Sequence, residues 1–113
     1  MPGWRIFYIW LFLSGYVIAA PGQNLISNPG FEDILVCPDQ SGQLTNAVSW
    51  LNPNLKSPDL YHRCVGPDCA NLPFVCVPDN WVGFQSPFSG QAYAGLFVGG
   101  GNPNREYMQV SLN

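Results

Sequence analysis

Apolar and polar residues alternate over several short stretches of the chain, and turn-forming residues separate these stretches. The segment 91–98 is the strongest strand prediction, and 106–112 alternates cleanly, with one apolar face. Shorter strands are expected near Trp50 and over 81–85. Asn-Pro-Gly at 28–30 favours a turn, because proline fixes φ and glycine permits positive φ. With 12 glycines and 11 prolines in the chain, long helices are disfavoured, and the pattern predicts an all-β, loop-rich fold.

The first apolar run does not alternate, and it follows the single positive charge of Arg5. A short positive start, an apolar stretch and small residues at its end are typical of a secretory leader. Residues 1–19 are therefore predicted to be a signal peptide, with cleavage after Ala19. The alternative is an uncleaved anchor helix, but the run 6–20 is shorter than the roughly 20 residues that cross a bilayer. After cleavage of the leader we expect no membrane span. Residues 20–113 are then the mature part of the protein.

Charge and composition exclude two classes of protein. Four Lys and Arg residues stand against seven Asp and Glu residues, giving a net charge of −3. No basic stripe is present to neutralise a phosphate backbone, so nucleic acid is not an expected partner. A hydrophobic content of 47% and an aromatic content of 14% are too high for a disordered chain.

Four cysteines behind a leader predict two disulfide bonds, and hence a secreted or cell-envelope location. Three pairings are possible, and the sequence alone does not choose among them. Cys69 and Cys76 bracket a loop short enough to close on itself, which would leave Cys37 with Cys64. The alternative is zinc, because His62 lies near three of these cysteines. The spacing does not follow the paired pattern of structural zinc sites.

Motifs for catalysis are scarce in the sequence, and we expect no enzyme activity. The chain has one histidine and no Gly-x-Ser-x-Gly elbow. Asp59 and His62 could act as acid and base. More often, an aspartate near a turn caps backbone N–H groups, and a lone histidine is a satisfied polar residue. The glycines at 99–101 are not followed by the residues of a phosphate-binding loop.

Four stretches occur in an order that resembles a known family: 24–33, Trp50, 89–95 and 106–110. Together they resemble the opening half of galactose-binding-like β-sandwich modules, the jelly-roll type found among carbohydrate-binding modules. Further stretches are similar to a domain in secreted surface proteins of gliding bacteria, where it often precedes an outer-membrane-protein-A-like, peptidoglycan-binding module. These stretches are Cys37-Pro38, Trp50–Pro53, Ser57–His62 and Val77–Asn80.

The resemblance implies an incomplete jelly-roll β-sandwich, with residues 20–113 forming its N-terminal part. Five or six strand candidates are fewer than the seven or more of a two-sheet sandwich, so we expect the chain to be a fragment of a longer protein. The resemblance also implies that Glu32 and Asp33 help to bind a structural calcium ion, which needs six to eight oxygen ligands. The alternative for this pair is a solvated surface position. No other cofactor is expected.

Aromatic residues supply the candidate binding site. Large aromatics dominate small β cores, and Trp50 and Tyr93, on expected strands, are assigned to the core. Trp81 lies in a loop-rich setting and is the better candidate for an exposed sugar platform, with Asn80 and Gln85 as polar neighbours. We therefore expect an exported, non-catalytic binding module whose partner is a glycan or another cell-envelope component. The alternative is a structural or adhesive envelope module without a glycan site, acting as a spacer for a downstream anchoring domain.

Overall fold

A computed structural model of the chain describes residues 22–66, 69, 73–99 and 104–113. The predicted signal peptide, residues 1–19, lies outside the described residues. The described part is built from short strands and two 3-10 turns, which confirms the all-β prediction. The elements are η1 (Leu44–Asn46), β1 (Trp50–Leu51), β2 (Asp59–His62), η2 (Arg63–Val65), β3 (Asp79–Asn80), β4 (Gly83–Phe84), β5 (Ala92–Gly95) and β6 (Gln109–Val110). None of the helices found there is long and apolar enough to cross a membrane.

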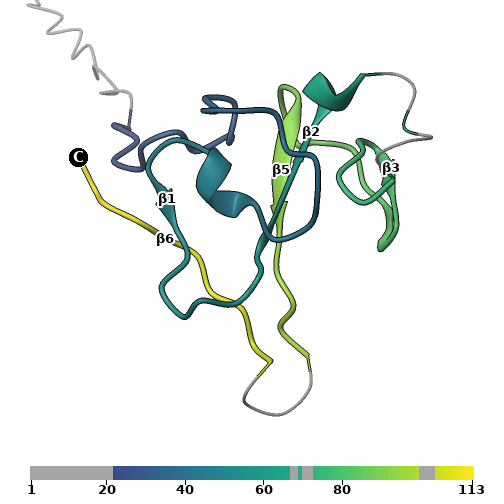
Figure 1. Ribbon diagram of the computed structural model, residues 1–113. Helices are drawn as coiled ribbons and strands as arrows, with labels where there is room; N and C mark the ends of the chain where they lie inside the picture. Colours follow the sequence, from purple (N-terminus) through teal and green to yellow (C-terminus); the bar gives the residue numbers. More distant parts are fainter. Residues whose placement is uncertain (1–21, 67–68, 70–72, 100–103) are drawn as a thin grey trace, which may run out of the picture.

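The strands pair as three antiparallel ribbons of two strands each: β1 with β6, β2 with β5, and β3 with β4. Figure 1 shows the β2–β5 ribbon in the middle, with β1 and β6 on one side and the β3 hairpin on the other. Isolated bridges join Ile26 to Leu112 and Ile34 to Ala47. The end of the chain therefore pairs with the start of the described part.

The core lies where η1, β1 and β2 meet. Leu44, Ala47, Trp50 and Leu60 are buried together there. The Trp50 indole N–H donates to the Asn28 carbonyl at 2.8 Å, which satisfies its polar atom inside the apolar cluster. Partly buried residues pack against this cluster from other segments: Phe31, Ile34, Ala94 and Val110. The core position expected for Trp50 is confirmed.

Two disulfide bonds join Cys37 to Cys64 and Cys69 to Cys76. Both predicted disulfides are thereby confirmed, and the short 69–76 loop does close on itself. The zinc alternative is wrong, because all four sulfurs are engaged in bridges. Bridges of this kind persist in oxidising compartments, so the chain belongs outside the cytoplasm.

Several strands are shorter than their sequence patterns suggest. The segment 91–98, the strongest strand prediction, is a regular strand only over β5, because beyond it Phe97 pairs with Glu106 instead. The Phe97 carbonyl accepts from the Glu106 N–H at 2.9 Å, and the Phe97 N–H donates to the Glu106 side chain at 2.8 Å. The Phe97 N–H is therefore bonded to the Glu106 carboxylate and not to a backbone carbonyl of a neighbouring strand. Regular strand pairing ends at this point.

Candidate functional site

An open cavity of about 890 Å³, here called the groove, lies against one face of the β2–β5 ribbon. Successive side chains of a strand point to opposite faces. Leu60 therefore points into the core, while Asp59 and Tyr61 of β2 and Tyr93 and Gly95 of β5 line the groove. In the ladder, Asp59 stands opposite Gly95 and Tyr61 opposite Tyr93. The volume is within the range of about 300–1,000 Å³ that is common for ligand sites.

Two stacked tyrosines form the floor of the groove. The rings of Tyr61 and Tyr93 lie 4.8 Å apart between centroids, with 25° between their planes. Tyr61 is fully buried, at 1% exposure, and Tyr93 is half-buried. Gly95 leaves room for this arrangement, because a Cβ at its position would lie 2.7 Å from Cε2 of Tyr61. The core position expected for Tyr93 is only partly correct, since its ring reaches the groove.

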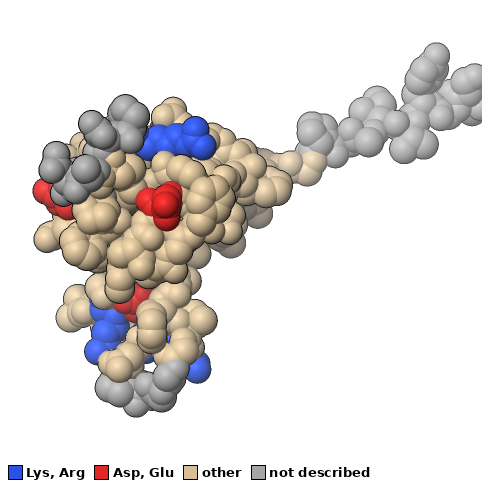
Figure 2. All heavy atoms as spheres, turned by 90° about the vertical axis from the view of Figure 1, so that its right-hand side faces the viewer, with Lys and Arg blue, Asp and Glu red and all other residues tan. Residues whose placement is uncertain are grey.

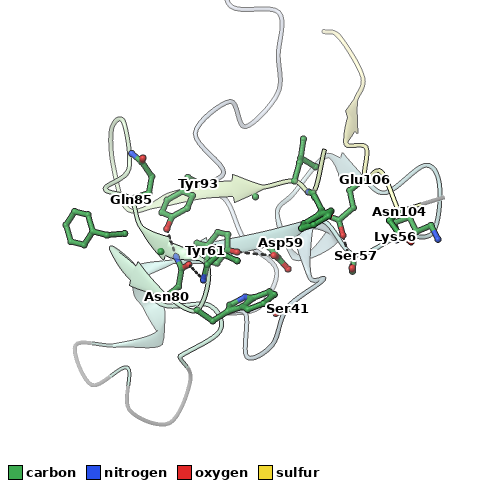
Figure 3. A pocket seen from close by; sticks show the side chains of 17 residues that line it. Ser41, Lys56, Ser57, Asp59, Tyr61, Asn80, Gln85, Tyr93, Asn104 and Glu106 are labelled. Carbon is green, nitrogen blue, oxygen red and sulfur yellow. Dashed lines mark hydrogen bonds between the residues drawn. The ribbon is translucent and has the colours of Figure 1, made fainter. Parts of the chain in front are cut away.

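The β3–β4 hairpin forms a wall of the groove and carries all three residues that the sequence predicted for ligand binding. Asn80, Trp81 and Gln85 line this one cavity. The Asn80 amide donates to the Tyr93 hydroxyl at 2.6 Å, so the hairpin is tied to the floor (Figure 3). Trp81 is 58% exposed, as expected for a platform.

The back of Trp81 rests on the segment closed by the second disulfide. Its backbone N–H donates to the Pro73 carbonyl at 3.1 Å. Its ring meets Phe74 edge-on, with 6.2 Å between centroids. The Asn80 amide also donates to the Cys76 carbonyl at 3.2 Å. The backbone bond and the Phe74 ring hold Trp81 against this segment, and its side chain is still more than half exposed.

The other end of the groove contains a buried carboxylate that the sequence analysis did not assign. Glu106 is 9% exposed. It accepts a hydrogen bond from the Ser57 hydroxyl at 2.8 Å and one from the Phe97 N–H at 2.8 Å. Figure 3 shows Glu106 and Ser57 at the end of the groove away from Gln85, with Asp59 between. The one feature of the sequence that could have indicated this site is the carboxylate of Glu106 in the otherwise alternating segment 106–112.

Asp59 is the second carboxylate of the groove. One oxygen accepts from the Gly42 N–H at 2.6 Å, and the other accepts from the Tyr61 hydroxyl at 2.9 Å. Burial raises the pKa of Asp59; the bonds from Gly42 and Tyr61 lower it, and the charge of Glu106 raises it. Burial and the adjacent Asp59 carboxylate raise the pKa of Tyr61 well above its ordinary value. The phenol therefore stays protonated and keeps donating to Asp59.

The structure does not bring Asp59 and His62 together as an acid–base pair. They occupy positions of opposite parity along β2, so their side chains point to opposite faces of the ribbon. His62 is 6% exposed, and its Nδ1 accepts from the Cys64 N–H at 2.9 Å. Both residues therefore have the non-catalytic roles given as the alternative in the sequence analysis. Asp59 caps a backbone N–H, and His62 is a polar residue with its hydrogen bond satisfied.

Glu32 and Asp33 are both exposed. One Glu32 oxygen accepts from the N–H groups of Gln91 and Ala92, at 2.8 and 3.1 Å, a role that the sequence analysis did not foresee. Within the described ranges, no group of three or more His, Cys, Asp or Glu side chains is placed to hold a metal ion. Calcium binding by this pair stays a prediction.

The groove combines aromatic faces with amide, hydroxyl and carboxylate groups, and this combination suits an uncharged polar ligand. Five aromatic side chains contribute to its lining: Tyr61, Trp81, Phe84, Tyr93 and Phe97. Figure 2 shows one face of the molecule, on which wide uncharged areas surround a few charged side chains in the upper part, while Lys or Arg side chains lie beside an Asp or Glu side chain in the lower part. Aromatic faces and fixed polar groups of this kind bind a ligand through stacking and directional hydrogen bonds.

Comparison of the chain with protein-family models, with curated proteins and with solved structures finds no match in any of the three.

Proposed function

We propose that this chain is an exported, non-catalytic binding module whose ligand is a glycan at the cell envelope or outside the cell. The two disulfides support an extracytoplasmic location. The motif order that resembles galactose-binding-like jelly-roll modules supports carbohydrate as the ligand class. On this proposal the three described ribbons belong to a sandwich of that type.

One observation carries the proposal: a half-exposed tryptophan lines a groove that also contains polar groups. Trp81 offers an aromatic face, which can stack on the apolar face of a pyranose ring. Asn80 and Gln85 line the same cavity. The Asn80 amide hydrogens are donated to Cys76 and Tyr93, so the side-chain oxygens of both residues are the groups that can accept from sugar hydroxyls. An aromatic surface with a few fixed polar groups is the usual composition of a small-ligand site.

The experiment is to measure glycan binding by the disulfide-bonded protein before and after Trp81→Ala. Oligosaccharide arrays and purified envelope polysaccharides supply the ligands, and calorimetry gives the affinity. We expect at least a tenfold loss of affinity, because the stacking face is removed. The melting temperature should change by no more than about 2–4 °C, the shift that small changes in the free energy of unfolding give, since Trp81 is 58% exposed.

Phe88→Ala is the matched control, because Phe88 is a fully exposed aromatic residue that is not part of the groove lining. Its affinity for glycan should equal that of the unaltered protein. Equal losses in both variants, or unchanged binding by Trp81→Ala, contradict the proposed platform. A large drop in melting temperature for Trp81→Ala would instead assign Trp81 to the core.

Exposed apolar side chains favour a second candidate, a structural or adhesive envelope module. Phe84, Phe97 and Val98 are each more than half exposed, at 72%, 62% and 64%. Apolar surface of this kind is found at protein contacts. This candidate predicts retention on envelope protein fractions with no binding to any glycan of the array, and Trp81→Ala would then leave glycan measurements unchanged at zero.

A further inference from the structure

Both carboxylates of the groove are held by neutral hydrogen-bond donors. Asp59 accepts from a backbone N–H and from the Tyr61 hydroxyl. Glu106 accepts from the Ser57 hydroxyl and from a backbone N–H. Each of these donors orients its carboxylate without cancelling the charge. The groove therefore contains two fixed negative charges whose hydrogen-bond partners are uncharged.

Burial makes these two charges effective toward a ligand. Glu106 is 9% exposed, and Asp59 is partly buried. Charges withdrawn from water are screened much less than exposed charges. Lys56 also lines the groove, but its side chain is exposed, so solvent and salt screen its positive charge. An anionic group entering the groove meets net repulsion.

The same carboxylates retain capacity to accept hydrogen bonds from a neutral ligand. An ionised carboxylate offers about four lone-pair positions, and the contacts above use one position on each oxygen. Sugar hydroxyls are donors that can occupy the remaining positions without bringing a charge into the groove. Hydrogen bonds to an ionised acceptor are stronger than those between neutral groups.

We infer that the groove selects uncharged glycans and rejects acidic glycans that carry carboxylate, sulfate or phosphate groups. This inference rests on the proposed glycan-binding function and adds the chemical class of the ligand. The selection comes from the negative charges of Asp59 and Glu106 together. The aromatic side chains of the groove can stack on glycans of both classes and do not distinguish them.

The test compares each oligosaccharide that binds on an array with its own C6-oxidised form, which differs by one carboxylate in place of a primary alcohol. In low-salt buffer we expect the oxidised form to bind at least tenfold more weakly. Asp59→Asn and Glu106→Gln should each reduce this difference severalfold, because they keep the side-chain shape and remove a charge. Raising the salt concentration should reduce it as well.

Two control variants separate the groove charges from net charge. Asp39→Asn makes the same change of net charge at an exposed carboxylate outside the groove lining, and it should leave the difference unchanged. Lys56→Gln removes the positive charge of the lining and should widen the difference. Melting curves of all four variants confirm that each is folded before its affinities are compared.

The outcomes distinguish this inference from the proposal beneath it. Acidic glycans that bind as well as uncharged ones overturn the inference and leave glycan binding intact. A difference that persists unchanged in both Asp59→Asn and Glu106→Gln also overturns it, because the C6 hydroxyl rather than charge would then decide. Absence of binding to every glycan of the array overturns the proposed function, and the inference with it.

Discussion

Replacing Glu106 by alanine should strongly destabilise the protein, because this one side chain joins three segments. Glu106 precedes β6, and its carboxylate accepts from Ser57, in the segment before β2, and from Phe97, in the segment after β5. The backbone N–H of Glu106 also donates to the Phe97 carbonyl at 2.9 Å. Alanine retains that backbone bond and removes both side-chain bonds.

The magnitude follows from the two lost hydrogen bonds. A bond to a charged group contributes about 1.5–3 kcal/mol to stability. Ser57 and Phe97 are both exposed, so water can replace part of the lost contacts, and removing a buried charge recovers some desolvation energy. The lower end for two such bonds is about 3 kcal/mol, and these compensations reduce it, so we expect a loss of about 2–3 kcal/mol in the free energy of unfolding. For a domain of this size that is a fall of about 10–20 °C in melting temperature.

The assay is urea denaturation of the disulfide-bonded protein followed by tryptophan fluorescence, with thermal melts as a second measure. Glu106→Gln is the matched control, because the amide oxygen still accepts from one donor and the Ser57 hydroxyl can accept from the amide N–H. Its loss should be about 1 kcal/mol or less, since one charged bond becomes neutral. Ser57→Ala should cost an intermediate amount, because it removes one donor only.

The reasoning is refuted if Glu106→Ala unfolds at the same urea concentration as the unaltered protein. It is refuted equally if Gln and Ala at this position destabilise the protein to the same extent. The loss of stability would then come from removing the negative charge and not from removing the two hydrogen bonds. A change in the slope of the transition would indicate an altered denatured state, and the thermal melts then decide the comparison.

Two further predictions concern the floor of the groove. Gly95→Ala should cost about 1–3 kcal/mol by overpacking, because its Cβ would lie 2.7 Å from a carbon of Tyr61, a residue 1% exposed and unable to move aside; an unaltered urea midpoint contradicts this. Burial raises the pKa of Asp59 above 3.8, so the folded protein binds this proton more tightly than the unfolded chain and gains stability as the pH falls toward that value. Melting temperatures of Asp59→Asn and the unaltered protein should therefore converge on acidification, and a constant or growing difference argues against the burial effect.

The positions of several strands could be predicted from the sequence, but their partners could not. Alternation located the strands at Trp50 and within 106–112, and an apolar run bounded by turn residues located the one within 91–98, because these patterns are local properties of the chain. The pairing of β1 with β6 joins segments about sixty residues apart. Strands of two residues contain too little pattern to specify such a partner, so tertiary packing decides it.

The candidate site was predicted in the one part where it is local in sequence. Asn80, Trp81 and Gln85 lie close together along the chain, and the hairpin that holds them is short. Asp59 and Glu106 reach the groove only through the register of β2 with β5 and the contact with Phe97. Alternation predicts that a strand has two faces. It does not predict which face packs against the core and which lines the groove when both faces contain large side chains.

The groove uses the same carboxylates for its structure and, on the inference above, for choosing its ligand, and the two roles are separable by chemistry. Their structural role needs an acceptor at a fixed position, which the amides of asparagine and glutamine largely retain. Their selective role needs negative charge, which the amides lack. Asp59→Asn and Glu106→Gln should therefore each leave a folded groove that distinguishes acidic from uncharged glycans severalfold less, whereas Glu106→Ala should weaken the fold itself. If charge selection and stability were lost in parallel across these variants, the carboxylates would act through shape alone, and repulsion of anions could not be the reason for the selection.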